Sequence, residues 1–183
     1  MALSTISRTV RLNGHQLFRD GECLYTGDSA TFLTDVYERL DLNYPKFYKM
    51  DRLSKAVFLG SEYLLQDFAT DSIPDFKKGI ILQNHSSSLD TDEKYQESLA
   101  SIPSPSLFVY TLPNICMGEI AIRHHFKGEN TFFITAEFDP NKLNQYVAIL
   151  FKENFLDLAI SGYAEVRNGK MDIQLRLEMR DVR

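Results

Sequence analysis

Cysteine is scarce in this sequence, with two residues in a chain of 183, and tryptophan is missing altogether. The two cysteines, Cys23 and Cys116, lie in unlike contexts and are too few for a disulfide scaffold or a cysteine zinc site. This usage fits a reducing compartment, and we expect a cytoplasmic protein. No apolar run approaches the roughly 20 residues that span a bilayer. Residues 1–12 lack the apolar core of a secretory signal, so we expect no export.

Basic charge is also in deficit. The chain has 20 Lys and Arg against 25 Asp and Glu, which gives a formal net charge of −5. A general phosphate-backbone binder needs a basic surface, so this balance argues against nucleic acid as a partner. Neither the Gly-x-Gly-x-x-Gly nor the Gly-x-x-x-x-Gly-Lys pattern of nucleotide-binding loops occurs. Metal-ligand spacings have little support either, and we expect no cofactor and no metal.

The composition that is present favours a packed core. Hydrophobic residues make up 44% of the chain, and its length suits a single domain over residues 1–183. Short alternating segments and the turn pairs Asn13-Gly14 and Asp20-Gly21 predict β structure in residues 5–25. Apolar periodicity predicts the later elements. We expect helices near residues 31–40, 50–68, 90–99, 114–126 and 141–151, and strands near residues 79–82, 131–136, 156–163 and 171–179.

The alternation of strands and helices with wide apolar faces predicts an α/β fold, a layered mixed sheet with helices. In the last strand, Ile173, Leu175 and Leu177 alternate with polar residues. This period of two indicates one face in water, and we expect a hairpin partner at a sheet edge. Asp139 followed by Pro140 predicts the start of the helix near residues 141–151.

Four short segments, in their order along the chain, resemble the β-ketoacyl-acyl-carrier-protein synthases. Residues 50–54 (Met-Asp-Arg-Leu-Ser) precede a buried helix, like the early helix of that family. Residues 112–123 are similar to its Leu-Pro-Asn-x-x-x-Gly-x-x-(Ala/Ser)-Ile segment. Residues 127–131 look like the Lys-Gly-Pro-Asn that leads into its nucleophile strand, and residues 161–165 look like its Ala-Gly-Gly-x-Glu. The resemblance covers residues 40–166 and implies the N-terminal half of a duplicated thiolase-like fold.

Two departures from the family bear on activity. The family strand runs into Thr-Ala-Cys, whose cysteine is acylated, whereas Thr135-Ala136 is followed here by Glu137. The sequence also stops after what would be the first half, without the two histidines and the lysine that the second half brings. A carboxylate is a poor acyl acceptor, and losing one oxyanion donor alone typically costs about 100- to 1000-fold in rate. The resemblance therefore predicts a protein that does not catalyse condensation by itself.

Several residues are candidates for a site, each with a plainer interpretation beside it. Glu137 is either a capping or polar structural residue or a carboxylate that shapes a pocket. His85 follows a predicted strand, where α/β sheets often place ligands, but it also fits an ordinary loop. Phe108, Tyr110 and Phe138 are candidates for a hydrophobic cleft that takes an acyl chain.

Other reactive side chains favour structural interpretations. The adjacent His124 and His125 end a predicted helix, which suits surface cations at a helix C-terminus. Cys116 lies within an apolar helix and is expected in the core. Residues 86–88 are serines without the Gly-x-Ser-x-Gly context of a hydrolase.

Three functional hypotheses remain open. The first is a non-catalytic, half-length ketosynthase-like protein that assists a full synthase or an acyl carrier protein in fatty acid, polyketide or aryl-polyene type biosynthesis. The second is an acyltransferase subunit that is active only in a complex, and the third is an acyl-chain binding module. Because the family pairs through its nucleophile strand, the resemblance implies a homodimer, or a heterodimer with a full-length ketosynthase. The implied interface strand is Asn130, Thr131, Phe132, Phe133, Ile134 and Thr135, with residues 112–123 nearby.

Overall fold

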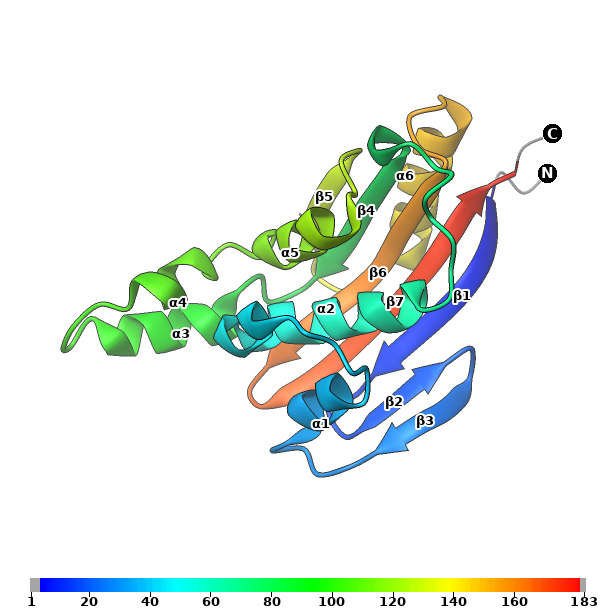
Figure 1. Cartoon of the computed structure of the whole chain (residues 1–183). Helices are drawn as coiled ribbons and strands as arrows, with labels where there is room; N and C mark the ends of the chain where they lie inside the picture. Colours follow the sequence, from blue (N-terminus) through cyan, green and yellow to red (C-terminus); the bar gives the residue numbers. More distant parts are fainter. Residues whose placement is uncertain (1–3, 182–183) are drawn as a thin grey trace.

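The computed structural model describes residues 4–181, and within them a seven-stranded mixed sheet forms the centre of the molecule (Figure 1). Its strand order is β3-β2-β1-β7-β6-β4-β5. The strands are β1 (Ser4–Leu12), β2 (Gln16–Arg19), β3 (Glu22–Thr26), β4 (Lys78–Asn84), β5 (Asn130–Ile134), β6 (Leu158–Arg167) and β7 (Lys170–Arg180). The predicted α/β layered fold is confirmed.

Helices cover both faces of this sheet (Figure 1). They are α1 (Phe32–Glu38), α2 (Arg52–Leu65), α3 (Leu89–Ser98), α4 (Pro105–Val109), α5 (Ile115–His124) and α6 (Pro140–Lys152), with short 3-10 turns η1 (Pro45–Lys49) and η2 (Asp75–Lys77). The α2 and α5 helices lie on one face, and α6 lies on the other. No helix in this part of the chain is long and apolar enough to cross a membrane.

Strand direction determines where a site can form. The β4 strand pairs in parallel with both β5 and β6, so the carboxyl ends of these three strands meet at one end of the sheet. The β7 strand is antiparallel to both β6 and β1. The predicted hairpin of β6 and β7 is confirmed, but the predicted edge position of β7 is wrong. Alternation reports how many faces of a strand meet water, and it does not report how many neighbours the strand has.

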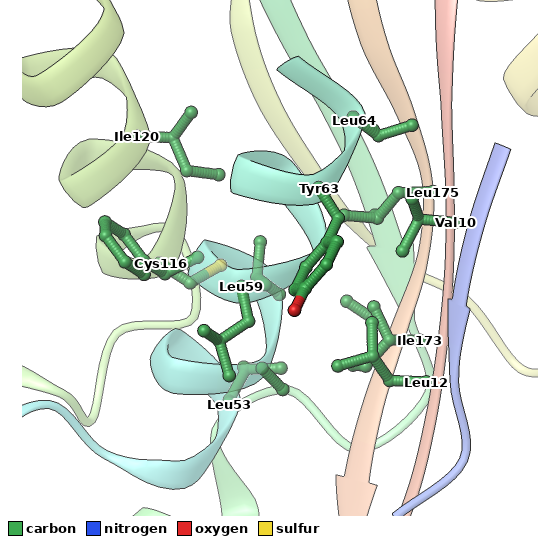
Figure 2. Packing of buried hydrophobic residues seen from close by; sticks show 14 of the residues in the cluster. Val10, Leu12, Leu53, Leu59, Tyr63, Leu64, Cys116, Ile120, Ile173 and Leu175 are labelled. Atoms are coloured by element: carbon green, nitrogen blue, oxygen red, sulfur yellow. The ribbon is translucent and has the colours of Figure 1, made fainter. Parts of the chain in front are cut away.

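The larger core lies between the sheet and α2 (Figure 2). Asp51 begins α2 by accepting a hydrogen bond from the Ser54 N–H at 2.8 Å. The helix is buried on nearly every side because β1, β6 and β7 lie beneath it and α5 lies alongside it. Gly60 allows this close approach, since a Cβ there would meet the Leu175 side chain at 2.8 Å.

The smaller core lies between the sheet and α6, where Leu143, Val147, Leu150 and Phe151 pack on Ile81 and Ala159. Asp139 caps this helix by accepting from the Lys142 N–H at 3.0 Å, and Pro140 fits the first turn. The predicted start of α6 is therefore confirmed. Because α6 lies mainly over β4 and β6, the polar side of β7 stays partly open.

Candidate functional site

The carboxyl ends of β4, β5 and β6 bring together three segments that are far apart in the sequence. Asn84 ends β4 and His85 follows it, Thr135 follows β5, and Glu165 lies near the end of β6. The Thr135 N–H donates to the Asn84 carbonyl at 2.8 Å, which holds the two loops side by side. Ligands in α/β sheets commonly bind at this end of parallel strands, so we take these residues as the candidate site.

Glu165 lies at the centre of this site. Its Oε2 accepts from the His85 N–H at 2.8 Å, from the Ser86 N–H at 3.2 Å and from the Tyr163 hydroxyl at 3.1 Å. Its Oε1 is buried and has no hydrogen-bond partner among the described residues. The carboxylate thus fixes the loop after β4 to β6 across 80 residues of sequence.

His85 extends into solvent from this loop. Its Nδ1–H donates to the Thr135 carbonyl at 3.2 Å, which leaves Nε2 facing away from that bond. In the part of the chain that the structure describes, no group of three or more His, Cys, Asp or Glu side chains could hold a metal ion. His85 therefore reaches the strand ends, as the sequence predicts, and it does so without a catalytic partner in the described chain.

Glu137 and Phe138 lie between β5 and α6, next to the same loops. Glu137 is exposed and makes no hydrogen bond or ion pair within residues 4–181. Glu137 was a candidate for capping α6, but Asp139 caps this helix instead. Phe138 packs on Tyr163, with ring centroids 5.0 Å apart.

Tyr163 is a site residue that sequence reasoning missed. Burial, reinforced by the nearby Glu165 carboxylate, raises the pKa of Tyr163 to about 12. Its hydroxyl therefore stays protonated and donates to Glu165 near neutral pH. The signal was visible in residues 161–165, where Tyr163 stands in place of the second glycine of the Ala-Gly-Gly-x-Glu segment.

A groove of about 530 Å³ opens beside the start of α6 on the sheet face that α6 leaves uncovered. Phe138, Leu143 and Phe18 give it apolar walls, and Arg11 and Arg176 line it from β1 and β7. Phe108 does not line this groove, and it packs on Tyr95 in α3 with ring centroids 5.5 Å apart. The expected cleft that joins Phe108 to Phe138 thus has no counterpart among the described contacts.

Neither cysteine of the chain lies at the candidate site. Cys116 is buried between α2 and α5 (Figure 2), and its Sγ–H donates to the Pro113 carbonyl at 3.0 Å. Burial raises the pKa of this thiol, which disfavours the reactive thiolate. Cys23 is exposed on β3, which the sheet order separates from β4 and β5. The site therefore offers hydrogen-bonding groups and no thiol nucleophile.

The predicted helix-end histidines have separate surroundings. His124 lies 2.6 Å from the Glu62 carboxylate through its Nε2, and the Arg123 Nε also reaches that carboxylate at 2.6 Å. His125 takes the left-handed conformation that ends α5, with φ of 57°. Both residues lie at the helix C-terminus, as the sequence predicts, and His124 contributes to an ion cluster there.

The predicted interface strand, β5, is the last strand of the described sheet. The Glu129 carbonyl accepts from the Ile80 N–H at 2.8 Å, and the Thr135 N–H donates to Asn84. Because backbone groups alternate along a strand, the odd-numbered residues bond to β4 and the groups of Asn130, Phe132 and Ile134 face outward. Ile134, the last residue of this edge strand, has an exposed apolar side chain.

No protein-family model matches the chain, and no curated protein matches it. Solved structures do match. The ishigamide ketosynthase/chain length factor has a TM-score of 0.73 at 16% identity, covering 98% of this chain and 62% of that chain. A ketosynthase in complex with its chain length factor from Xenorhabdus doucetiae gives 0.64 at 10% identity, covering 100% of this chain and 81% of that chain. A type II polyketide synthase acyl-carrier protein in complex with its ketosynthase has a TM-score of 0.70 at 11% identity, and the match covers 97% of this chain and 62% of that chain.

These likenesses show a ketosynthase-like fold over essentially the whole chain. The chain spans 62% of the length of the ishigamide ketosynthase/chain length factor. Because the comparison rests on backbone shape at low identity, the equivalence of Glu137 with the family's nucleophile cysteine stays a prediction.

Proposed function

We propose that this chain is a non-catalytic ketosynthase-like protein that assists a full synthase, or its acyl carrier protein, in fatty acid, polyketide or aryl-polyene type biosynthesis. The observation that carries the proposal is a ketosynthase-like fold whose candidate site has no thiol. Acyl transfer through a thioester needs a thiolate, and the groups at the strand ends are poor substitutes. Glu137 is an exposed carboxylate, and Glu165 is engaged in holding a loop.

The partner surface in this proposal is the free edge of β5. Outward N–H and C=O groups on Asn130, Phe132 and Ile134 form a ready template for a strand of another molecule. The Ile134 side chain is 52% exposed, so apolar area lies next to these backbone groups. A complete ketosynthase or a second copy of this chain, paired through β5, would cover both features at once.

Light scattering after size-exclusion chromatography tests the pairing, with the chain alone and mixed with a complete ketosynthase from the same organism. We expect a dimer in one of the two samples. Ile134→Pro removes an outward N–H and spares the bonds to β4, so it should abolish the dimer. Ile134→Ala is the matched control, because it removes the same apolar side chain and keeps the N–H.

Two results would contradict the pairing. One is a monomer at every concentration with no co-elution of any complete ketosynthase of that organism. The other is equal dimerisation of Ile134→Pro and the unmodified chain. Intact mass spectrometry after incubation with an acyl-pantetheine thioester tests the catalytic half of the proposal. We expect no acyl adduct, and stoichiometric acylation of the chain alone would refute a non-catalytic role.

The alternative of an acyltransferase subunit active only in a complex is tested in the reconstituted pair. Glu137→Gln and His85→Ala should leave turnover and product length unchanged if the chain is non-catalytic. Glu153→Gln, an exposed carboxylate at the far end of α6, is the control. A change in turnover or product length with Glu137→Gln or His85→Ala, but not with Glu153→Gln, would favour the alternative.

The groove beside α6 favours one second candidate, acyl-chain binding. Its apolar walls at Phe138, Leu143 and Phe18 would accept a hydrocarbon chain. A melting temperature that rises with the length of an acyl-pantetheine chain would support this candidate, and no stabilisation at any length would count against it.

A further inference from the structure

A second cavity, of about 600 Å³, lies on the opposite face of the sheet at the start of α2. Residues from α1, the first turn of α2, α3 and the β6–β7 turn line it. Three cations, Arg52, Lys55 and Lys94, are among the lining residues, and we name it the cationic cavity. No feature of the candidate site or of the β5 edge accounts for it.

The charges of the cationic cavity are incompletely balanced. Arg52 and Lys55 form no ion pair within residues 4–181, whereas Lys94 pairs with Asp90 at 2.6 Å. The Lys55 ammonium has an aromatic neighbour instead, since its Nζ lies 5.5 Å from the centroid of the Phe47 ring. Asp51 is the one carboxylate among the described lining residues. It accepts from the Ser54 N–H at 2.8 Å and from the Thr91 hydroxyl at 2.6 Å, so neutral donors already occupy both of its oxygens.

The position of these cations at the start of a helix is electrostatically unfavourable. Arg52 and Lys55 lie in the first turn of a 14-residue helix, where the helix dipole opposes positive charge. Burial also lowers the pKa of Lys55, with the Asp51 charge acting against that effect. This cluster stands out in a chain whose net charge is −5. An anion bound in the cavity would give Arg52 and Lys55 a counter-ion and would offset their repulsion by the helix dipole.

We propose that the cationic cavity binds the phosphate group of a small molecule, with Arg52 and Lys55 as its main contacts. A guanidinium fork matches phosphate oxygens in a bidentate way, and Lys55 adds a point charge. Two cations without a counter-ion also match the charge of a phosphate monoester, about −1.5 to −2 at pH 7. Leu33 and Leu107, both half-buried, line the same cavity and offer an apolar surface for the rest of the molecule.

Isothermal titration calorimetry of the full chain with pyrophosphate at low salt tests the site. We expect saturable binding, and Arg52→Gln and Lys55→Gln should each weaken it by about tenfold or more, since each removes a charge-assisted contact. Lys49→Gln is the matched control, because Lys49 is an exposed cation on neighbouring η1 that does not line the cavity. The melting temperature without ligand should not fall in Arg52→Gln, which separates lost binding from lost folding.

Three outcomes would overturn the proposal. The first is no heat at millimolar pyrophosphate. The second is an equal loss of binding in Lys49→Gln, which would indicate only general charge attraction. The third is equally tight binding of succinate, which would assign the cavity to carboxylates. None of these outcomes depends on a ketosynthase partner or on an acyl group.

Discussion

Replacing Glu62 with glutamine should destabilise the fold by more than the loss of an exposed ion pair would. The Glu62 side chain is 7% exposed, and Arg123 and His124 both contact its carboxylate at 2.6 Å. Arg123 also lies over the Tyr44 and Phe58 rings, at 5.1 and 5.7 Å from their centroids. Glu62→Gln leaves the Arg123 charge confined without its counter-ion.

The size of this effect follows from the exposure of the partners. Removing one member of a fully buried ion pair costs about 3–5 kcal/mol of folding stability. Here the Arg123 and His124 side chains are 24% and 21% exposed, so the pair is only partly buried. We therefore expect a loss of about 2–3 kcal/mol at pH 7. In a domain of this length that corresponds to a fall in melting temperature of about 4–12 °C.

The same carboxylate makes the loss depend on pH. Burial alone raises the pKa of Glu62, but hydrogen bonds from His124 and Arg123 outweigh burial and leave the pKa below the ordinary 4.5. A carboxyl whose folded pKa is depressed stabilises the fold above its unfolded pKa and loses that contribution as the pH falls through the folded value. The difference between the unmodified chain and Glu62→Gln should therefore shrink between pH 4.5 and pH 3.

Urea unfolding followed by circular dichroism at pH 7 and pH 3 measures both quantities. Glu93→Gln is the control, because Glu93 also makes a double contact to an arginine, Arg167, at 2.6 and 2.9 Å. Its side chain is 53% exposed, so solvent screens the pair and little change is expected. A loss below about 1 kcal/mol for Glu62→Gln, or the same loss at both pH values, would refute the reasoning.

Three further changes test other parts of the fold. Gly162→Ala should prevent folding or lower the melting temperature sharply, because the new Cβ would lie 2.0 Å from the Gln174 carbonyl oxygen; an unaltered melting curve would contradict this packing. Asp139→Ala should cost about 1 kcal/mol in urea unfolding through loss of the α6 cap, and Asp139→Asn should restore most of it. A thiol reagent at pH 8 should modify Cys23 rapidly and the buried Cys116 only on unfolding, and mass spectrometry that finds two fast modifications would show the core to be more open.

Helices with a clear local pattern were the easiest part to predict. In α6, Leu143, Val147, Leu150 and Phe151 repeat at helical spacing, and Asp139 and Pro140 precede them. Both signals act over a few residues and do not depend on the rest of the chain. The short α4 was missed because only Ser104 and Pro105 indicate its start, and its five residues hold no periodicity to detect.

Contacts between distant segments were harder to predict. The sequence placed His85 after one predicted strand and Glu137 after another, and in the structure the His85 ring bonds to Thr135, two residues before Glu137. The bond from the His85 N–H to Glu165 depends on β4 and β6 being neighbours, which no local pattern specifies. The same limit applies to β7, whose polar face remains partly open because α6 covers other strands.

The two ends of the sheet differ in a way that governs how molecules can join. At the β3 end, the pairing with β2 contains an irregularity between Leu17 and Phe18, and Glu22 adds charge to a short strand. Such features discourage further strands from adding. At the β5 end the ladder with β4 is regular over its whole length. If molecules join through β5, as we propose, growth at one end only would yield closed pairs and not open-ended fibres.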